Sequence, residues 1–103
     1  MIPQIKMTAW ILESLENVRQ SEPVYQDVAL DEGTILLGPG TPFDSIAFTA
    51  FAVGLEEKIE KEAGIEFALE VAEIFNPGEG GLSVRELSKR LERLVAQAAE
   101  KSA

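Results

Sequence analysis

A change from turn-forming to helix-forming residues near Asp44 constrains this chain more than any other sequence feature. Segment 38–42, GPGTP, contains two glycines and two prolines and cannot propagate a helix. Segment 46–59 contains no proline and a single glycine, so we expect a helix to begin near Asp44. The Asp44 carboxylate can accept a hydrogen bond from a first-turn amide and suits the positive end of the helix dipole. Ser45 then lies at the first helical position with its hydroxyl facing solvent.

Composition limits the chemistry that the chain can perform. The 103 residues are 46% hydrophobic, which suits one domain over residues 1–103 with a single small core. Eighteen acidic residues against nine basic ones give a net charge of -9, which argues against binding to nucleic acid or to anionic membranes. The chain has neither cysteine nor histidine, so it lacks a thiol nucleophile, sulfur ligands for a metal and the commonest general base. We therefore expect no enzyme, no catalytic residue and no metal site.

Hydropathy gives no sign of export or of membrane insertion. No basic region followed by a long apolar run stands at the N-terminus, and no segment approaches the length needed to cross a bilayer. No internal repeat or low-complexity tract divides the chain. We expect a cytoplasmic monomer. The residues after Ala98 are expected to form a fraying terminus.

Apolar periodicity predicts an all-α fold of four helices, with a long loop between the first two and a short third helix. The first helix is expected over residues 4–20 and the long loop over residues 21–43. Scattered aliphatic residues in that loop favour packing over disorder. The expected apolar stripe of the first helix comprises Ile5, Ala9, Leu12 and Leu15, with Ile11 and Val18 beside it.

The second helix, over Ser45 to Glu62, is apolar nearly all the way round in its first half. A helix of this kind is largely buried or else exposes an apolar patch. The apolar residues are Ile46, Ala47, Phe48, Ala50, Phe51, Ala52, Val53 and Leu55.

The last two helices differ in how clearly their ends are marked. A short third helix is expected over residues 65–75, although Ile65, Phe67 and Val71 also suit a strand, and the Gly- and Pro-rich segment 76–81 ends it. The composition of the loop 76–82 is more typical of a flexible connector than of a lid. Ser83 and Glu86 form a capping box for the fourth helix. Its apolar face comprises Val84, Leu87, Leu91, Leu94, Val95 and Ala98.

Charge is distributed unevenly along the chain. Segment 20–57 contains seven acidic residues and no Lys or Arg, whereas five of the nine basic residues lie after position 84. One interpretation is a solvated face that aids solubility. The other is an acidic docking surface for basic patches on partner proteins, which raises association rate and selectivity.

Three motifs in the middle of the chain have a spacing typical of a known family. Asp and Ser are common at helix starts, so Asp44-Ser45 alone indicates only a cap. Read together, however, PFDSI (42–46), LEEKI (55–59) and GIEF (64–67) resemble the acyl carrier proteins, whose pattern is G-x-D-S-L, L-E-x-x-F and a G-I-x-I-like segment. The resemblance implies a four-helix acyl-carrier-like bundle.

The resemblance also implies a cofactor and a first partner. Ser45 matches the serine that carries phosphopantetheine, which a separate phosphopantetheinyl transferase takes from coenzyme A. Asp44 would orient the helix entrance and meet that transferase. A cavity for an acyl chain would lie between the second and third helices. Its candidate lining residues, which are equally good core residues, are Phe51, Leu55, Ile65, Phe67 and Ile74.

The chain departs from the family pattern in ways that predict a specialised member. The family places acidic residues two and five positions after its serine, where this chain has Ala47 and Ala50, and Pro42 replaces the usual glycine. A two-residue extension also separates Ile59 from Gly64. The hypothesis is docking to a dedicated partner through apolar contacts near Ser45 and acidic contacts further along the helix. The predicted contact residues are Ile46, Ala47, Ala50, Glu56, Glu57 and Glu60.

The resemblance implies that the chain functions as an acyl carrier. Acyl groups would be held as thioesters on the arm of Ser45 and delivered to acyl-transferring, ligating or condensing enzymes of fatty-acid, polyketide or related synthesis. Two alternatives stay open. One is an aminoacyl or peptidyl carrier, and the other is a carrier-like helical interaction module whose serine is not modified.

Overall fold

The computed structural model describes residues 2–76, 78 and 80–102. Helices predominate in this part of the chain, and the expected second and fourth helices are confirmed to within a residue or two at their starts. A small two-stranded sheet was not expected. The elements are α1 Gln4–Ser21, η1 Pro23–Tyr25 (a 3₁₀ turn), β1 Ile35–Leu37, α2 Ser45–Ala63, α3 Val71–Ile74, β2 Leu82–Ser83 and α4 Val84–Ser102.

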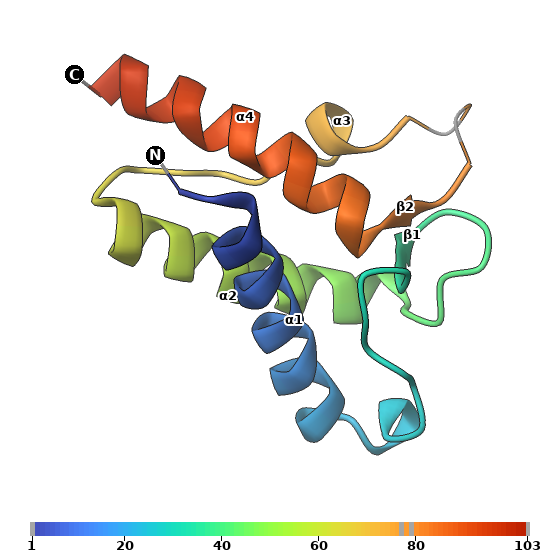
Figure 1. The fold of residues 1–103 in the computed structure, drawn as a ribbon. Coiled ribbons are helices and arrows are strands. Elements are labelled where there is room, and N and C mark those ends of the chain that lie inside the picture. The colour runs from blue at the N-terminus through green and yellow to red at the C-terminus, as the bar shows by residue number, and fades with distance from the viewer. Residues whose placement is uncertain (1, 77, 79, 103) are drawn as a thin grey trace.

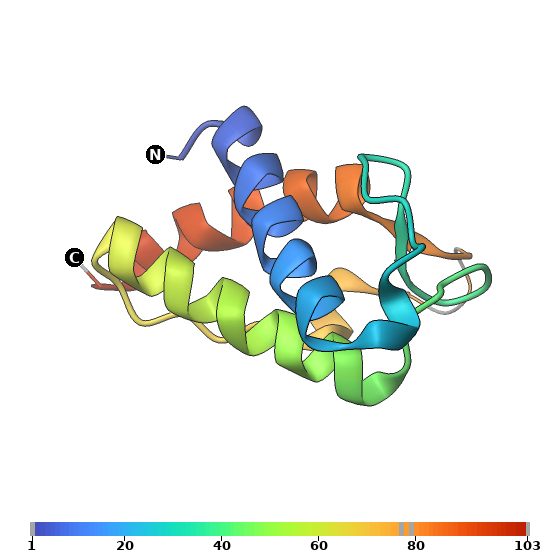
Figure 2. The ribbon, with the colours of Figure 1, turned by 90° about the horizontal axis from the view of Figure 1, so that it is seen from below.

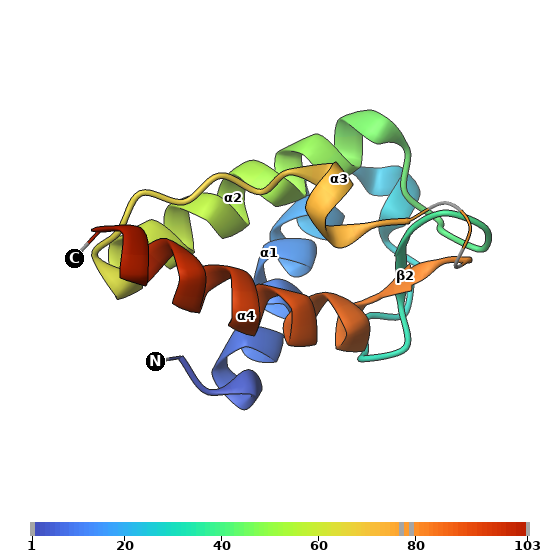
Figure 3. The same cartoon turned by 90° about the horizontal axis from the view of Figure 1, so that it is seen from above.

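The helices enclose one core between α2 and α4 (Figure 1). Helix α1 crosses both of these helices on one side, as Figure 2 shows. Figure 3 shows α3 on the opposite side, with the segment that precedes it running beside α2. The largest side chains with under 2% exposure are Phe51, Met7, Ile11, Leu15, Leu36, Leu55, Ile59, Ile74, Leu82, Leu87 and Leu91.

The buried face of α1 agrees with the expected stripe at Ile11, Leu15 and Val18 but not at Ile5 and Ala9, which are exposed. Met7, Ile11, Leu15 and Val18 are buried at helical spacing, whereas Ile5 is 81% exposed. Both sets of residues recur every three or four positions, so periodicity alone does not decide which face meets the core. Contacts with α2 and α4 decide it, and they leave Ile5 and Ala9 exposed while Leu12 is half-buried against the core.

The long connection between α1 and α2 is tied to the start of α4. Strands β1 and β2 pair in antiparallel fashion, with Ile35 opposite Ser83 and Leu37 opposite Leu82. The amide of Val84 donates to the carbonyl of Thr34 at 2.9 Å. The long loop is packed, as its aliphatic residues predict. Backbone hydrogen bonds hold it in place as well as side-chain contacts.

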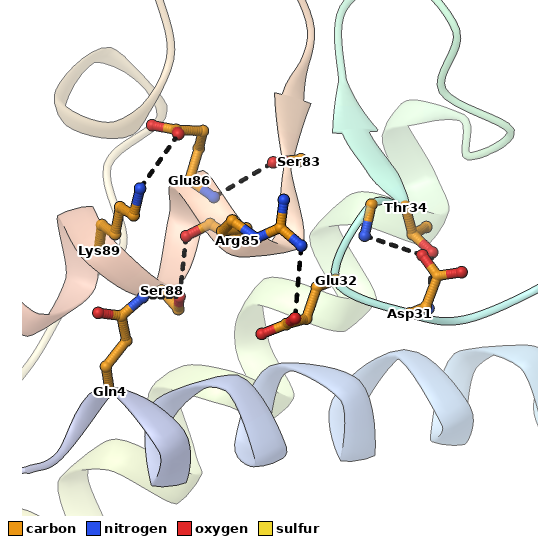
Figure 4. A network of polar contacts seen from close by, with 10 residues as sticks. Gln4, Asp31, Glu32, Thr34, Ser83, Arg85, Glu86, Ser88 and Lys89 are labelled. Atoms are coloured by element: carbon orange, nitrogen blue, oxygen red, sulfur yellow. Dashed lines mark hydrogen bonds and ion pairs between the residues drawn. The ribbon is translucent and has the colours of Figure 1, made fainter.

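Polar contacts extend this attachment around the first turn of α4 (Figure 4). The Arg85 amide donates to the Glu32 carbonyl at 3.0 Å, and its guanidinium lies 3.4 Å from the Glu32 carboxylate. Ser83 Oγ accepts from the Glu86 amide at 3.2 Å, which confirms the serine half of the capping box, while the Glu86 carboxylate lies 3.8 Å from Lys89 Nζ. Helix α4 then continues past Ala98, after which a fraying terminus was expected, and ends at Ser102.

The expected third helix over residues 65–75 is wrong for its first half. Only Val71–Ile74 are helical, and residues 65–70 alternate between half-buried and exposed, the period of an extended chain. The odd-numbered residues Ile65, Phe67 and Leu69 face the core. The strand-like residues noted in the sequence account for this conformation. The loop 76–82 includes Pro77 and Glu79, which lie outside the described residues.

Candidate functional site

The start of α2 presents Ser45 as the sequence predicts. Asp44 is the N-cap residue in extended conformation, and its carboxylate accepts a hydrogen bond from the Ala47 amide at 2.7 Å. Ser45 is the first helical residue and is exposed. Its carbonyl accepts from the Thr49 hydroxyl at 2.8 Å, within the first helical turn. The Ser45 hydroxyl is therefore accessible to another protein on a helix end that is fixed by a charged cap.

An aromatic pair supports this helix end from the long loop. The Asp44 amide donates to the hydroxyl of Tyr25 at 3.3 Å, and the ring of Tyr25 lies 5.2 Å from that of Phe43 between centroids. Both aromatic residues are buried. Tyr25 thus fixes the residue that precedes Ser45, a role that the sequence pattern did not reveal because the loop lacks a regular period.

The turn before Asp44 depends on two glycines. Gly38 and Gly40 have φ of 87° and 91°, a left-handed conformation that other residues rarely adopt. A Cβ on Gly38 would also stand 3.0 Å from the Phe75 ring. Both glycines therefore adopt a backbone conformation that the nearby Pro42, whose ring fixes a negative φ, could not adopt.

The predicted apolar contact residues divide between surface and core. Ile46 is 77% exposed and Ala50 is also exposed. Ala47 is only 5% exposed and belongs to the core. Any apolar contact with a partner near Ser45 would therefore use Ile46 and Ala50, with Ala47 packing behind them.

The predicted acidic contact residues divide in a similar way. Glu57 is exposed and Glu60 is half-buried. The half-buried carboxylate of Glu56 accepts a hydrogen bond from the Leu69 amide at 2.5 Å. Glu56 therefore has a role inside the fold, where it holds the extended segment 65–70 against α2.

The residues considered for a cavity between α2 and α3 fill the core. Phe51, Leu55 and Ile74 are at most 1% exposed, and Ile65 and Phe67 are half-buried against them. Their packing agrees with the alternative that the sequence left open, in which they are ordinary core residues.

Basic residues on α4 form local ion pairs with neighbouring acids. Arg85 pairs with Glu32 and Lys89 with Glu86, and both pairs are largely exposed. The Arg90 guanidinium donates to the carbonyl of Ile74 and so joins α4 to α3. These contacts agree with a solvated face on α4.

Comparisons with protein-family models, with curated proteins and with solved structures found no match for this chain. Within the described residues, no group of three or more acidic, histidine or cysteine side chains could hold a metal ion. No helix in this part of the chain is sufficiently long and apolar to span a membrane. The geometry around Ser45 and the sequence motifs are therefore the features that indicate a function.

Proposed function

We propose that this chain is an acyl carrier protein in which Ser45 carries phosphopantetheine. The observation that carries the proposal is the exposed Ser45 at the first position of α2, directly after the capping Asp44. A hydroxyl presented in this way can be modified by another enzyme without unfolding of the chain. The motifs around positions 42–46, 55–59 and 64–67 add the family resemblance.

The arrangement of helices supports an acyl-carrier-like bundle. Three long helices and one short helix are present among the described residues, and segment 22–44 forms a long connection between α1 and α2. This is the pattern of helix lengths and connections that the resemblance implies. The sheet formed by β1 and β2 would be a local addition that holds the long loop on α4.

The proposed modification is a phosphoryl transfer performed by a separate transferase. The Ser45 oxygen forms a bond to the phosphorus that bears the pantetheine of coenzyme A, and the phosphoanhydride bond breaks to release adenosine 3′,5′-bisphosphate. The hydroxyl proton passes to a general base in the site of the transferase. When bound, the arm would supply the only thiol on the protein, which can hold an acyl group as a thioester.

The exposed side of α2 is the proposed docking surface for partner enzymes. Ile46 and Ala50 provide the apolar part, and Glu57 and Glu60 provide the acidic part. The transferase, and then acyl-transferring, ligating or condensing enzymes with basic patches, would associate with this surface. The acidic character of segment 20–57 extends the same complementarity around Ser45.

Intact mass measurement tests the proposal directly. The native chain is incubated with coenzyme A, magnesium and a broad-specificity phosphopantetheinyl transferase, beside the variants Ser45→Ala and Thr49→Ala. We expect the mass of one phosphopantetheine on the native chain and on Thr49→Ala, whose hydroxyl lies one turn away, and none on Ser45→Ala. No gain on the native chain, with this transferase or with one from the source cell, would contradict the proposal.

An unmodified helical interaction module is the second candidate function. The exposed apolar residues Ile46 and Val53, seven positions apart on α2, favour it because they would suit a protein contact that needs no cofactor. An aminoacyl or peptidyl cargo is a variant of the first proposal. Competition between cargo classes for a loading enzyme would distinguish the two kinds of carrier.

A further inference from the structure

The outer side of α1 carries apolar side chains that the fold does not cover. Ile5 is 81% exposed, Ala9 is also exposed and Leu12 is half-buried. These residues recur at a spacing of three and four positions, so they share one face of the helix. Figure 2 looks onto α1 from outside, where no described helix or strand lies over it. We call Ile5, Ala9 and Leu12 the outer α1 face.

An open hollow follows the outer α1 face. Its volume is about 380 Å³ and its lining is mainly apolar, with Gln4, Thr8 and Glu32 completing its rim. Apolar residues that are exposed singly are normal on a protein surface, but contiguous ones in a hollow are typical of a contact surface. A partner that covered this hollow would remove the exposed Ile5 side chain from water, which is favourable.

Two residues of opposite charge border the outer α1 face on one flank. Lys6 and Glu13 are seven positions apart, about two helical turns, so they lie along the same side of α1. Both are exposed, and neither forms an ion pair with another residue in the described part of the chain. The point midway between them lies beside Ala9, close to the middle of the face.

Opposite charges on either side of Ala9 make the face complementary to itself. If a second copy lies antiparallel across a two-fold axis at Ala9, Lys6 of each copy meets Glu13 of the other. A parallel arrangement would place like charges together, which is unfavourable. The small side chain of Ala9 lets the two helices approach closely at the axis, with Ile5 and Leu12 filling the space on either side.

The opposite rim of the hollow favours a second copy over a basic partner. Glu32 stands there, and its carboxylate already lies 3.4 Å from the guanidinium of Arg85. Its charge is therefore largely balanced within its own chain. The outer α1 face thus lacks the unbalanced acidic charge that would attract the basic patches proposed to meet α2.

We propose that the outer α1 face is a contact between two copies of this chain, with their α1 helices antiparallel. One helix from each copy buries less surface than the ~1,200–2,000 Å² of a stable complex, so the dimer is weak and reversible. The contact uses no residue of the surface proposed for partner enzymes. It is therefore independent of the proposed carrier function.

Sedimentation equilibrium of the full unmodified chain tests the contact. The native chain is measured at increasing concentrations up to about 1 mM, which reaches the range of weak dissociation constants. We expect its average mass to rise from that of a monomer toward that of a dimer. Ile5→Glu should stay monomeric, whereas Val24→Glu, at another exposed aliphatic residue, should dimerise like the native chain. Circular dichroism checks that both variants are folded.

Exchange of the flanking charges tests the antiparallel arrangement. Lys6→Glu leaves two acidic side chains on the flank and Glu13→Lys leaves two basic ones. Each variant alone should dimerise more weakly, by up to about fivefold for each of the two ion pairs lost. An equimolar mixture of the two variants should dimerise again, and so should the chain that carries both changes. Lys61→Glu, at an exposed position of α2, controls for the change in net charge.

Three outcomes would overturn the inference. A native chain that stays monomeric up to about 1 mM excludes the contact. A dimer that persists in Ile5→Glu places the contact elsewhere on the molecule. Native affinity in both charge variants, with no effect of mixing them, excludes the antiparallel arrangement. None of these results bears on Ser45, whose modification is measured separately by mass.

Discussion

The carboxylate of Glu56 accepts a hydrogen bond from the backbone amide of Leu69 at 2.5 Å and so joins α2 to the extended segment before α3. A hydrogen bond to a charged group contributes about 1.5–3 kcal/mol. We expect Glu56→Ala to lower the free energy of unfolding by about that amount. Urea denaturation followed by circular dichroism measures the change.

Glu57 provides the control because it is the next residue and is exposed. Substitutions at such positions usually change stability by less than about 0.5 kcal/mol. The urea midpoint of Glu57→Ala should therefore equal that of the native chain. If both variants lost the same free energy of unfolding, the contact between Glu56 and Leu69 would contribute nothing to stability. Charge reversal at Glu57 and Glu60, rather than at Glu56, is then the clean test of acidic docking.

Two glycines of α2 should respond in opposite ways to the same substitution. Gly54 lies in the helix interior with open space around it, and Gly64 ends the helix at φ 68°. Gly54→Ala should stabilise the fold by about 1 kcal/mol, because alanine is the better helix former. Gly64→Ala should destabilise it by about 1–2 kcal/mol, because a Cβ is unfavourable in the left-handed conformation. Thermal unfolding of both variants measures the signs, and a shift in the same direction would contradict this account.

Loss of the Tyr25 hydroxyl should loosen the approach to Ser45. Tyr25→Phe keeps the ring beside Phe43 but removes the acceptor of the Asp44 amide. We expect a stability loss of about 1 kcal/mol and faster hydrogen exchange at the Asp44 amide. If the Asp44 amide exchanged hydrogen at the same rate in the variant as in the native chain, water would replace the Tyr25 hydroxyl without loss of stability.

Local signals in the sequence predicted the elements that depend on nearby residues. The start of α2 follows from the glycine-proline turn and Asp44, and the start of α4 follows from Ser83. Both are capped by side chains within three residues of the amides that they bind. Such contacts can be read from spacing alone. The exposure of Ser45 followed from the same argument.

Contacts between distant residues could not be read in that way. The pairing of β1 with β2 joins residues nearly fifty positions apart, and the choice of the Met7 face over the Ile5 face of α1 depends on two other helices. The hydrogen bond between Glu56 and Leu69 joins α2 to the segment 65–70, which was expected to be helical. Alternation over residues 65–70 was the available signal for that segment.

Acid should weaken one contact at the end of α1. Arg19 donates to both carboxylate oxygens of Glu16 and lowers the pKa of Glu16 below its ordinary value of 4.5. The contribution of this pair to stability is therefore complete above the ordinary pKa and is lost as the pH falls through the lowered pKa. The urea midpoint of the native chain should exceed that of Glu16→Gln at neutral pH, and the difference should shrink in acid. A difference independent of pH would exclude this role for the charge.

Two substitutions at Asp44 separate its role as a cap from any role of its charge in recognition. Asp44→Ala removes the acceptor for the Ala47 amide and should cost about 0.5–2 kcal/mol of stability, whereas Asp44→Asn keeps an acceptor and should stay near the native value. If the transferase meets the carboxylate, both variants should be modified at Ser45 more slowly than the native chain. If Asp44 acts only as a cap, Asp44→Asn should be modified at the native rate. Initial rates from intact mass, measured beside the urea midpoints, decide between the two roles.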